Sequence, residues 1–179
     1  MKNVLKFIIS IIICQLAGVI GAFFTTPKIN TWYASLNKPS FTPPGSFIGS
    51  VWLILFFLMG ISLYLVWSKN WQINIPAGGQ ERKAWNRFSE KLWSGNWREE
   101  NTIAIFILQL VLNILWSEIF FGWQLPGLAF FELIMLWFAI LYTIANFYRV
   151  SKTAAYLLIP YIFWVSFAGF LNFTLWRMN

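Results

Sequence analysis

The chain has 179 residues, of which 59% are hydrophobic and only 11% are charged, whereas a soluble domain carries about a quarter charged residues. It contains no histidine, no aspartate and a single cysteine, Cys14. This composition excludes histidine-based acid–base chemistry, histidine-ligated haem or metal, cysteine-cluster metal sites and an internal disulfide. It predicts an all-α membrane protein, and the length suits one domain.

Five segments are long enough for helices that cross a hydrocarbon core of roughly 30 Å. They cover about residues 5–24, 47–67, 102–121, 127–147 and 153–175. Together they predict a five-transmembrane-helix bundle that forms one domain over residues 1–179. The first segment could instead be a signal peptide, because Lys2 and Lys6 precede it. Its apolar run is too long for that and no A-x-A site follows, so we interpret it as a retained helix.

The connector between the first two spans, residues 32–45, is aromatic and rich in proline; we term it the lid. A residue that precedes proline avoids the helical region, so Lys38, Thr42 and Pro43 are predicted to be non-helical. Thr42 is predicted to cap the next helix, with a proline in the first turn of that helix. The lid should therefore be ordered rather than slack.

The second connection, residues 68–101, is the longest. Apolar residues recur at helical spacing from 81 to 93, opposite basic residues. This pattern predicts a short helix in the lipid headgroup region, with a mobile polar loop as the alternative. The third connection, residues 122–126, is short and uncharged. It predicts a tight antiparallel pair of helices.

Basic residues are distributed unequally between the two ends of the predicted bundle. Ten fall on the side of the N-terminus and three on the side of the lid. The positive-inside rule then predicts an integral protein of the cell membrane with a cytoplasmic N-terminus and an outward-facing lid. The net charge of +7 is not gathered on a soluble face, so a nucleic-acid partner is not expected. Membrane lipid is the expected partner of these charges.

Most of the 12 tryptophans are explained by the membrane. Those at span ends, Trp32 among them, are predicted to anchor at the interface. Four lie within spans: Trp52, Trp116, Trp137 and Trp164. Trp137 has no polar neighbour in the sequence and is predicted to face lipid.

Polar residues within the spans mark inward faces, because lipid-exposed amides are unfavourable. One stripe combines Gln109, Asn113, Trp116, Ser117 and Phe120 at spacings of three and four. A second stripe on the last span combines Trp164, Ala168 and Asn172. These stripes predict a cavity with flat aromatic walls and a few amides, suited to a large planar apolar molecule. A tightly packed bundle without a cavity is the alternative.

Two carboxylates, Glu118 and Glu132, fall within spans and are functional candidates for that reason. Glu118 lies near the third connection, and we interpret it as reaching toward the interface. Glu132 lies deeper, and either a structural or a functional role fits it.

Three motifs, in order along the chain, resemble a known family. They are W-Y-x-x-L-x-K-P-x-F-x-P-P followed by Trp52, then Q-L-V-L-N-I-L-W-S from Gln109, then L-L-I-P-Y-I-F-W from Leu157. They resemble the tryptophan-rich sensory protein family, whose animal members are the translocator proteins. The resemblance implies a five-helix bundle, commonly a homodimer, with a ligand pocket near the lid. It implies porphyrins and related tetrapyrroles as ligands, with sterols in animal members and synthetic benzodiazepine-type compounds.

The resemblance also implies pocket residues, which the polar stripe extends by Ser117 and Phe120. The combined set of candidate ligand-binding residues is Tyr33, Pro44, Trp52, Asn113, Trp116, Ser117, Phe120, Trp164, Ala168 and Leu171. Some bacterial relatives are linked to light-dependent porphyrin breakdown, for which Trp52 and Trp164 are the candidate redox residues. No other catalytic residue, no metal site and no cofactor is expected; a porphyrin or haem would be a ligand without histidine ligation.

The chain departs from the family in two places. Its second connection is longer, and Phe173 stands where the sterol-recognition stretch has a tyrosine. The missing hydroxyl argues against sterol binding. Glu132 occupies a place where an animal relative has an acidic residue.

These observations favour a membrane receptor or binding protein for tetrapyrroles, with a role in tetrapyrrole handling or stress response. A light-dependent porphyrin-degrading enzyme is the first alternative. A tetrapyrrole or sterol transporter is the second alternative. It ranks below the enzyme because the sequence has neither a pair of Gly/Pro-broken helices nor a repeated half, which are typical of transporters.

Overall fold

The computed structural model describes residues 2–69 and 95–179. Within them lie five helices long and apolar enough to cross a membrane, which confirms the predicted five-span all-α fold. The elements are α1 (Lys2–Ile29), α2 (Trp32–Ser35), α3 (Gly45–Trp67), α5 (Gly95–Ser117), the π-helix η2 (Glu118–Gly122), α6 (Pro126–Val150), α7 (Lys152–Leu157) and α8 (Ile159–Met178). The surface helix predicted over 81–93 lies outside the described residues.

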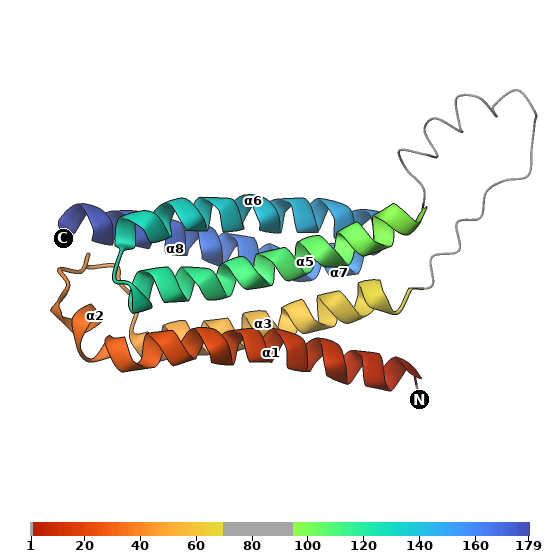
Figure 1. The fold of residues 1–179 in the computed structure, drawn as a ribbon, viewed down its shortest axis with the longest axis horizontal. Helices are drawn as coiled ribbons and strands as arrows, with labels where there is room; N and C mark the ends of the chain where they lie inside the picture. The colour runs from red at the N-terminus through yellow and green to blue at the C-terminus, as the bar shows by residue number, and fades with distance from the viewer. Residues whose placement is uncertain (1, 70–94) are drawn as a thin grey trace, which may run out of the picture.

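The long helices lie side by side and the chain runs back and forth along them (Figure 1). The N-terminus, the start of α5 and the junction of α6 with α7 share one end, which we call the basic end. The lid, the turn between η2 and α6, and the C-terminus share the other, the lid end. At the basic end the Lys6 ammonium donates to the Trp67 carbonyl at 3.1 Å, and Lys69 donates to the Val150 carbonyl at 2.9 Å. The two cations therefore cap the C-termini of α3 and α6, where positive charge is favourable.

The packing is uneven along the bundle. Helix α1 packs on α3 and α5, and α6 packs on α5 and α8. Helix α3 packs extensively against α7, whereas its backbone lies further from α8, which continues the same span. The two helices meet through large rings: Phe47 contacts Trp164 and Trp52 contacts Tyr161, each with ring centroids 6.2 Å apart. Helices α3 and α8 therefore diverge toward the lid end.

The first helix is longer than predicted: it was expected to end near residue 24 but continues to Ile29 and includes Pro27. The Thr25 hydroxyl donates to the Gly21 carbonyl at 3.0 Å and so is satisfied within the helix. The predicted lid then contains the one-turn helix α2. Local polarity in the sequence thus marked the end of the apolar stretch rather than the end of the helix.

Lys38, Thr42 and Pro43 are non-helical, as predicted. The predicted Thr42 cap is wrong. Its hydroxyl donates to the Pro39 carbonyl at 2.8 Å and closes a turn within the lid, while Pro44 occupies the N-cap of α3 without a side-chain cap. Two further prolines hold the chain extended after Thr42, so its hydroxyl is too far from the first turn of α3.

The lid is fastened to the last helix. The Asn37 amide N–H donates to Asn179 Oδ1 at 2.9 Å, and Asn179 Nδ2 donates to the Asn37 carbonyl at 3.1 Å. Phe41 stacks on Phe170 with ring centroids 5.3 Å apart. These contacts hold the lid against α8 and support the prediction of an ordered lid.

The third connection joins α5 and α6 as an antiparallel pair, as predicted. Before the turn the chain widens into η2, and Gln124 adopts a positive φ of 59°. The wider helix buries the consecutive residues Phe120 and Phe121 together. The sequence carries no signal for this π-helix.

Two tryptophans make contacts that the sequence did not predict. The ring of Trp32 packs edge-on against Phe120 at 5.4 Å, at the edge of the buried cluster that includes Phe121 and Leu171. Trp137 is half-buried, and its indole N–H donates to the Ser166 hydroxyl at 2.9 Å between α6 and α8. The polar neighbour that the sequence lacked comes from another helix.

Candidate ligand-binding site

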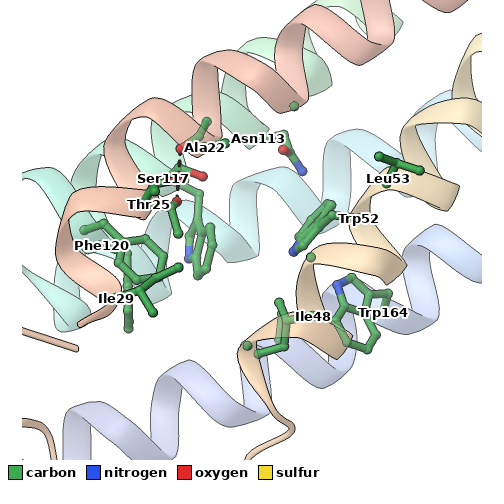
Figure 2. A pocket seen from close by; sticks show the side chains of 18 of the residues that line it. Ala22, Thr25, Ile29, Ile48, Trp52, Leu53, Asn113, Ser117, Phe120 and Trp164 are labelled. Carbon is green, nitrogen blue, oxygen red and sulfur yellow. Dashed lines mark hydrogen bonds between the residues drawn. The ribbon is translucent and has the colours of Figure 1, made fainter. Parts of the chain in front are cut away.

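A cavity of about 400 Å³ lies in the lid-end half of the bundle, where α3 and α8 diverge. Helices α1, α3, α5, η2 and α8 line it, together with Tyr33 of the lid (Figure 2). Its size falls within the range of small-molecule sites. The alternative of a bundle without a cavity is therefore wrong: the divergence leaves a space that the aromatic side chains do not fill.

The structure brings most of the predicted site residues to this cavity. Those that line it are Tyr33, Trp52, Asn113, Trp116, Ser117, Phe120, Trp164, Ala168 and Leu171. Pro44 does not line it; it is exposed at the start of α3, next to Gly45, which does. Proline at this position shapes the approach of the chain to α3 instead.

The cavity walls are flat aromatic surfaces held by neighbouring rings. Trp116 stacks on Phe120 at 5.3 Å with an interplanar angle of 21°, and Trp52 stacks on Phe56 at 5.6 Å and 30°. Figure 2 shows Trp52 and Trp164 on one side of the cavity and Ser117 and Phe120 on the other. Such faces favour stacking with a planar guest.

Buried hydrogen bonds orient the walls. The Trp116 indole donates to Asn172 Oδ1 at 3.0 Å, and Asn172 Nδ2 donates to the Pro126 carbonyl at 2.7 Å. Asn113 Nδ2 donates to the Tyr161 hydroxyl at 3.0 Å. These bonds join α5, α6 and α8 and leave the Asn113 carbonyl oxygen beside the cavity as an acceptor.

One indole donor at the wall is not satisfied. Trp164 Nε1 is buried and has no hydrogen-bond partner within the described part of the chain. An unpaired buried donor is unfavourable. A rotation of the indole toward the cavity would pair this donor with an acceptor on a ligand.

At the lid end, Tyr33 contributes a half-buried phenol. Burial raises the pKa of this phenol above its usual value, so the hydroxyl is neutral at physiological pH and can donate. Lys38 Nζ lies 4.7 Å from the centre of the Tyr33 ring. This contact places a cation next to the cavity without placing it inside.

Sequence reasoning missed the contribution of α1. This helix supplies small residues to the wall, among them Gly18, Gly21, Ala22 and Thr25. Their spacing of three and four was visible as a stripe of small residues. The polar residues of α1 that also line the cavity, Gln15, Thr25 and Thr26, were the signal that could have marked this face as inward.

Two buried polar side chains lie outside the cavity lining. Within the described ranges, neither Gln109 nor Glu132 has a hydrogen-bond partner for its side-chain polar atoms. Glu118 is half-buried at the start of η2. Among residues 2–69 and 95–179, no three His, Cys, Asp or Glu side chains gather as metal ligands would.

Five apolar helices around an aromatic-walled cavity define an integral membrane protein with an internal small-molecule-sized site. The model of the TspO/MBR family matches residues 10–177, and the chain belongs to this family. It is 37% identical to the tryptophan-rich protein TspO of Archaeoglobus fulgidus over 177 residues, which cover 99% of each chain. It is 35% identical to the protein of the same name from Chlorobaculum tepidum, covering 99% of this chain and 98% of the relative. It is also 35% identical to the human translocator protein, covering 92% of this chain and 85% of the relative.

Proposed function

We propose that this protein is a membrane receptor or binding protein for planar hydrophobic molecules, most specifically porphyrins and related tetrapyrroles, with a role in tetrapyrrole handling or stress response. The observation that carries the proposal is the cavity itself, walled by Trp52, Trp116 and Trp164 from three different helices. A flat macrocycle would bury its faces against these rings and gain both apolar burial and stacking. The family membership supports the same ligand class.

The polar groups at the wall suit a guest with few hydrogen-bonding groups. The Asn113 carbonyl oxygen could accept from a pyrrole N–H, and the unpaired Trp164 N–H could donate to a carboxylate. A carboxylate at the lid end would also lie near Lys38, whose ammonium sits over Tyr33. A haem would bind in the same manner, as a ligand without histidine ligation and not as a resident cofactor.

The proposed setting is the cell membrane, with the N-terminus in the cytoplasm and the lid outside. The distribution of basic residues supports this orientation. We also propose a homodimer, on the basis of the family resemblance alone. Cross-linking in native membranes tests the homodimer. Labelling of a cysteine introduced at Asn37 tests the orientation, because a membrane-impermeant thiol reagent added outside the cell should reach an outward-facing lid.

Equilibrium titration of the purified protein with protoporphyrin IX tests the ligand class. Binding is followed by the shift of the main porphyrin absorption band, which does not depend on the number of tryptophans left in a variant. The double variant Trp52→Ala with Trp164→Ala should bind at least about tenfold more weakly, because it loses two stacking faces. Trp137→Phe, which lies outside the cavity lining, is the control and should bind as the wild type does. Equal affinity of the wild type and the double variant would contradict the proposal.

Light-dependent porphyrin breakdown is the second candidate function, favoured by two indoles, Trp52 and Trp164, that line the same cavity on the side away from Ser117 and Phe120 (Figure 2). One indole would donate an electron to the photoexcited porphyrin, which would pass it to dioxygen and form superoxide. The indole radical cation would then recover an electron from the porphyrin. Superoxide would add to the resulting porphyrin radical cation, so that one dioxygen is incorporated into the macrocycle and the indole is regenerated. Illumination of the complex should then bleach the porphyrin faster than an equal concentration of free tryptophan does. The acceleration should require oxygen and should be lost when both indoles are replaced by phenylalanine. Bleaching at the rate of the free amino acid would remove this candidate.

A further inference from the structure

The solvent or lipid exposure of the cavity-lining residues is distributed unevenly around the wall. The lining residues of α5, η2 and α8 are buried or half-buried. Every exposed lining residue lies on α1 or α3: they are Val19, Ala22, Thr26, Ile29, Gly45, Gly49 and Leu53. A side chain that borders the cavity and is also exposed belongs to its mouth. The mouth therefore lies between α1 and α3.

This mouth faces sideways, toward lipid. The rim residues of α3 recur every four positions from Gly45 to Leu53, which places them in about the first 12 Å of that membrane-spanning helix. Those of α1 also follow one helical stripe. The rim contains no charged residue, and Thr26 is its one polar side chain. Such an opening is compatible with hydrocarbon and not with an aqueous vestibule.

The mouth is closed on the side of the basic end. There Gln15 Nε2 donates to the Leu53 carbonyl at 3.3 Å across the two helices. Gly18 of α1 also lies close to Phe56 of α3: a Cβ added at Gly18 would lie 2.7 Å from the Phe56 ring. Figure 2 shows α1, with Ala22 and Ile29, on one side of the cavity and α3, with Ile48 and Leu53, on the other.

The lid contributes little to the wall: of its residues 32–45, Tyr33 and Gly45, the first residue of α3, line the cavity. The lid is also fastened to α8 by the reciprocal bonds of Asn37 and Asn179. We propose that the mouth between α1 and α3 is a lateral portal through which lipophilic ligands enter and leave the cavity from the hydrocarbon, while the lid remains fastened. This inference rests on the proposed function for the identity of the ligand, but not for the existence of the opening.

Gly49 offers a direct way to narrow the portal. Nothing lies within 4 Å of a Cβ added there, so a larger side chain fits without displacing the helices. In phosphatidylcholine nanodiscs, Gly49→Phe should lower both the association and the dissociation rate constants of protoporphyrin IX, each by about tenfold. Ser50→Phe is the matched control: it places the same ring one residue away on α3, at an exposed position outside the lining. It should leave both rate constants unchanged.

The dissociation rate constant distinguishes a narrowed passage from a damaged site. A variant that merely loses contacts with the porphyrin releases it faster, whereas a narrowed exit releases it more slowly. Unchanged or faster release from Gly49→Phe, with binding intact, would overturn the portal and leave the proposed function standing.

A second measurement does not need the porphyrin. Phosphatidylcholine brominated in its acyl chains should quench Trp52 through the open mouth, so Trp52→Phe should reduce the quenched fraction of the protein fluorescence. In a Gly49→Phe background, the same replacement should change it little. If Trp52→Phe has the same effect in both backgrounds, the opening to lipid is absent, whatever the protein binds. Failure of porphyrin binding in the wild type would, by contrast, overturn only the proposed function.

Discussion

The two halves of the bundle use the same helices in opposite ways. Toward the basic end, α1 and α3 approach so closely that a Cβ at Gly60 would lie 2.9 Å from Ile11 Cα and 3.2 Å from the Ser10 carbonyl. Toward the lid end, an added Cβ at Gly45 or Gly49 of the same α3 meets nothing within 4 Å. Glycine in the first half lets two backbones pack; in the second, Gly45 and Gly49 leave two positions of the α3 rim without a side chain. The residue type is the same, and its role depends on the distance between the helices.

The largest expected effect comes from forcing the closed half apart. Gly60→Ala should lower the free energy of unfolding by about 2 kcal/mol, because the new methyl group meets backbone that cannot move aside. Gly49→Ala, the matched change in the open half, should cost nothing. Reversible unfolding in mixed detergent–SDS micelles, followed by circular dichroism, measures both. Equal destabilisation by the two variants would refute the contrast between the halves.

A smaller effect is expected from the hydrogen bonds that hold the cavity wall. Asn172→Leu leaves the Trp116 indole N–H and the Pro126 carbonyl without their partner. The free energy of unfolding should fall by about 1–2 kcal/mol. Asn146→Leu is the control, because the Asn146 amide donates to the Tyr142 carbonyl of its own helix, α6. A stability loss no greater than that of the control would show that this network contributes little.

The bond between Trp137 and Ser166 should contribute still less. It lies at a half-exposed seam between α6 and α8, and single interhelical bonds in membranes average about 0.6 kcal/mol. Trp137→Phe and Ser166→Ala should each lower the free energy of unfolding by about that amount. The double variant should lose clearly less than the sum of the two, because both remove the same bond. Additive losses would mean that the two side chains do not interact.

The smallest global effect is expected at the lid. Asn179→Ala removes the side chain that pairs with Asn37 at the surface. The free energy of unfolding should fall by about 0.5 kcal/mol, the lower end of the usual range for a hydrogen bond, because water replaces the lost partner. Its clearer consequence should be local: amide hydrogen exchange over residues 36–44 should accelerate, with the spans unchanged. Lid exchange identical to that of the wild type would show that these bonds do not fasten the lid.

Much of the fold could be predicted because membrane helices must satisfy their backbone internally. The five spans, the short turn between α5 and α6 and the non-helical residues of the lid follow from local composition and proline. The errors share one cause. Each depends on which partner a polar group finds, and a pattern of residue types does not specify that partner. The Thr25 hydroxyl bonds within α1, the Thr42 hydroxyl closes a turn in the lid, and the Trp137 indole bonds to Ser166 of α8.

The candidate site was predictable on α5 and α8, where amides share a face with tryptophans. The prediction missed α1, where small and apolar residues make up most of the lining and the polar Gln15, Thr25 and Thr26 were not recognised as inward. It was also wrong at Pro44, which lies near the cavity but outside its wall. The sequence did not predict the rim between α1 and α3. A glycine at the mouth of a cavity and a glycine at a close helix contact differ only in the distance to the neighbouring helix, and the sequence does not contain that distance.

The sequence by itself determined that this protein resides in a membrane, crosses it five times, and directs particular indoles and amides inward. Hydrophobicity and periodicity are properties of single helices, so they can be determined from the residues of each segment alone. The tertiary structure alone decided that α3 diverges from α8 and that the resulting space opens between α1 and α3. Separations between helices arise from many contacts made at once, and no segment of the chain carries that information alone.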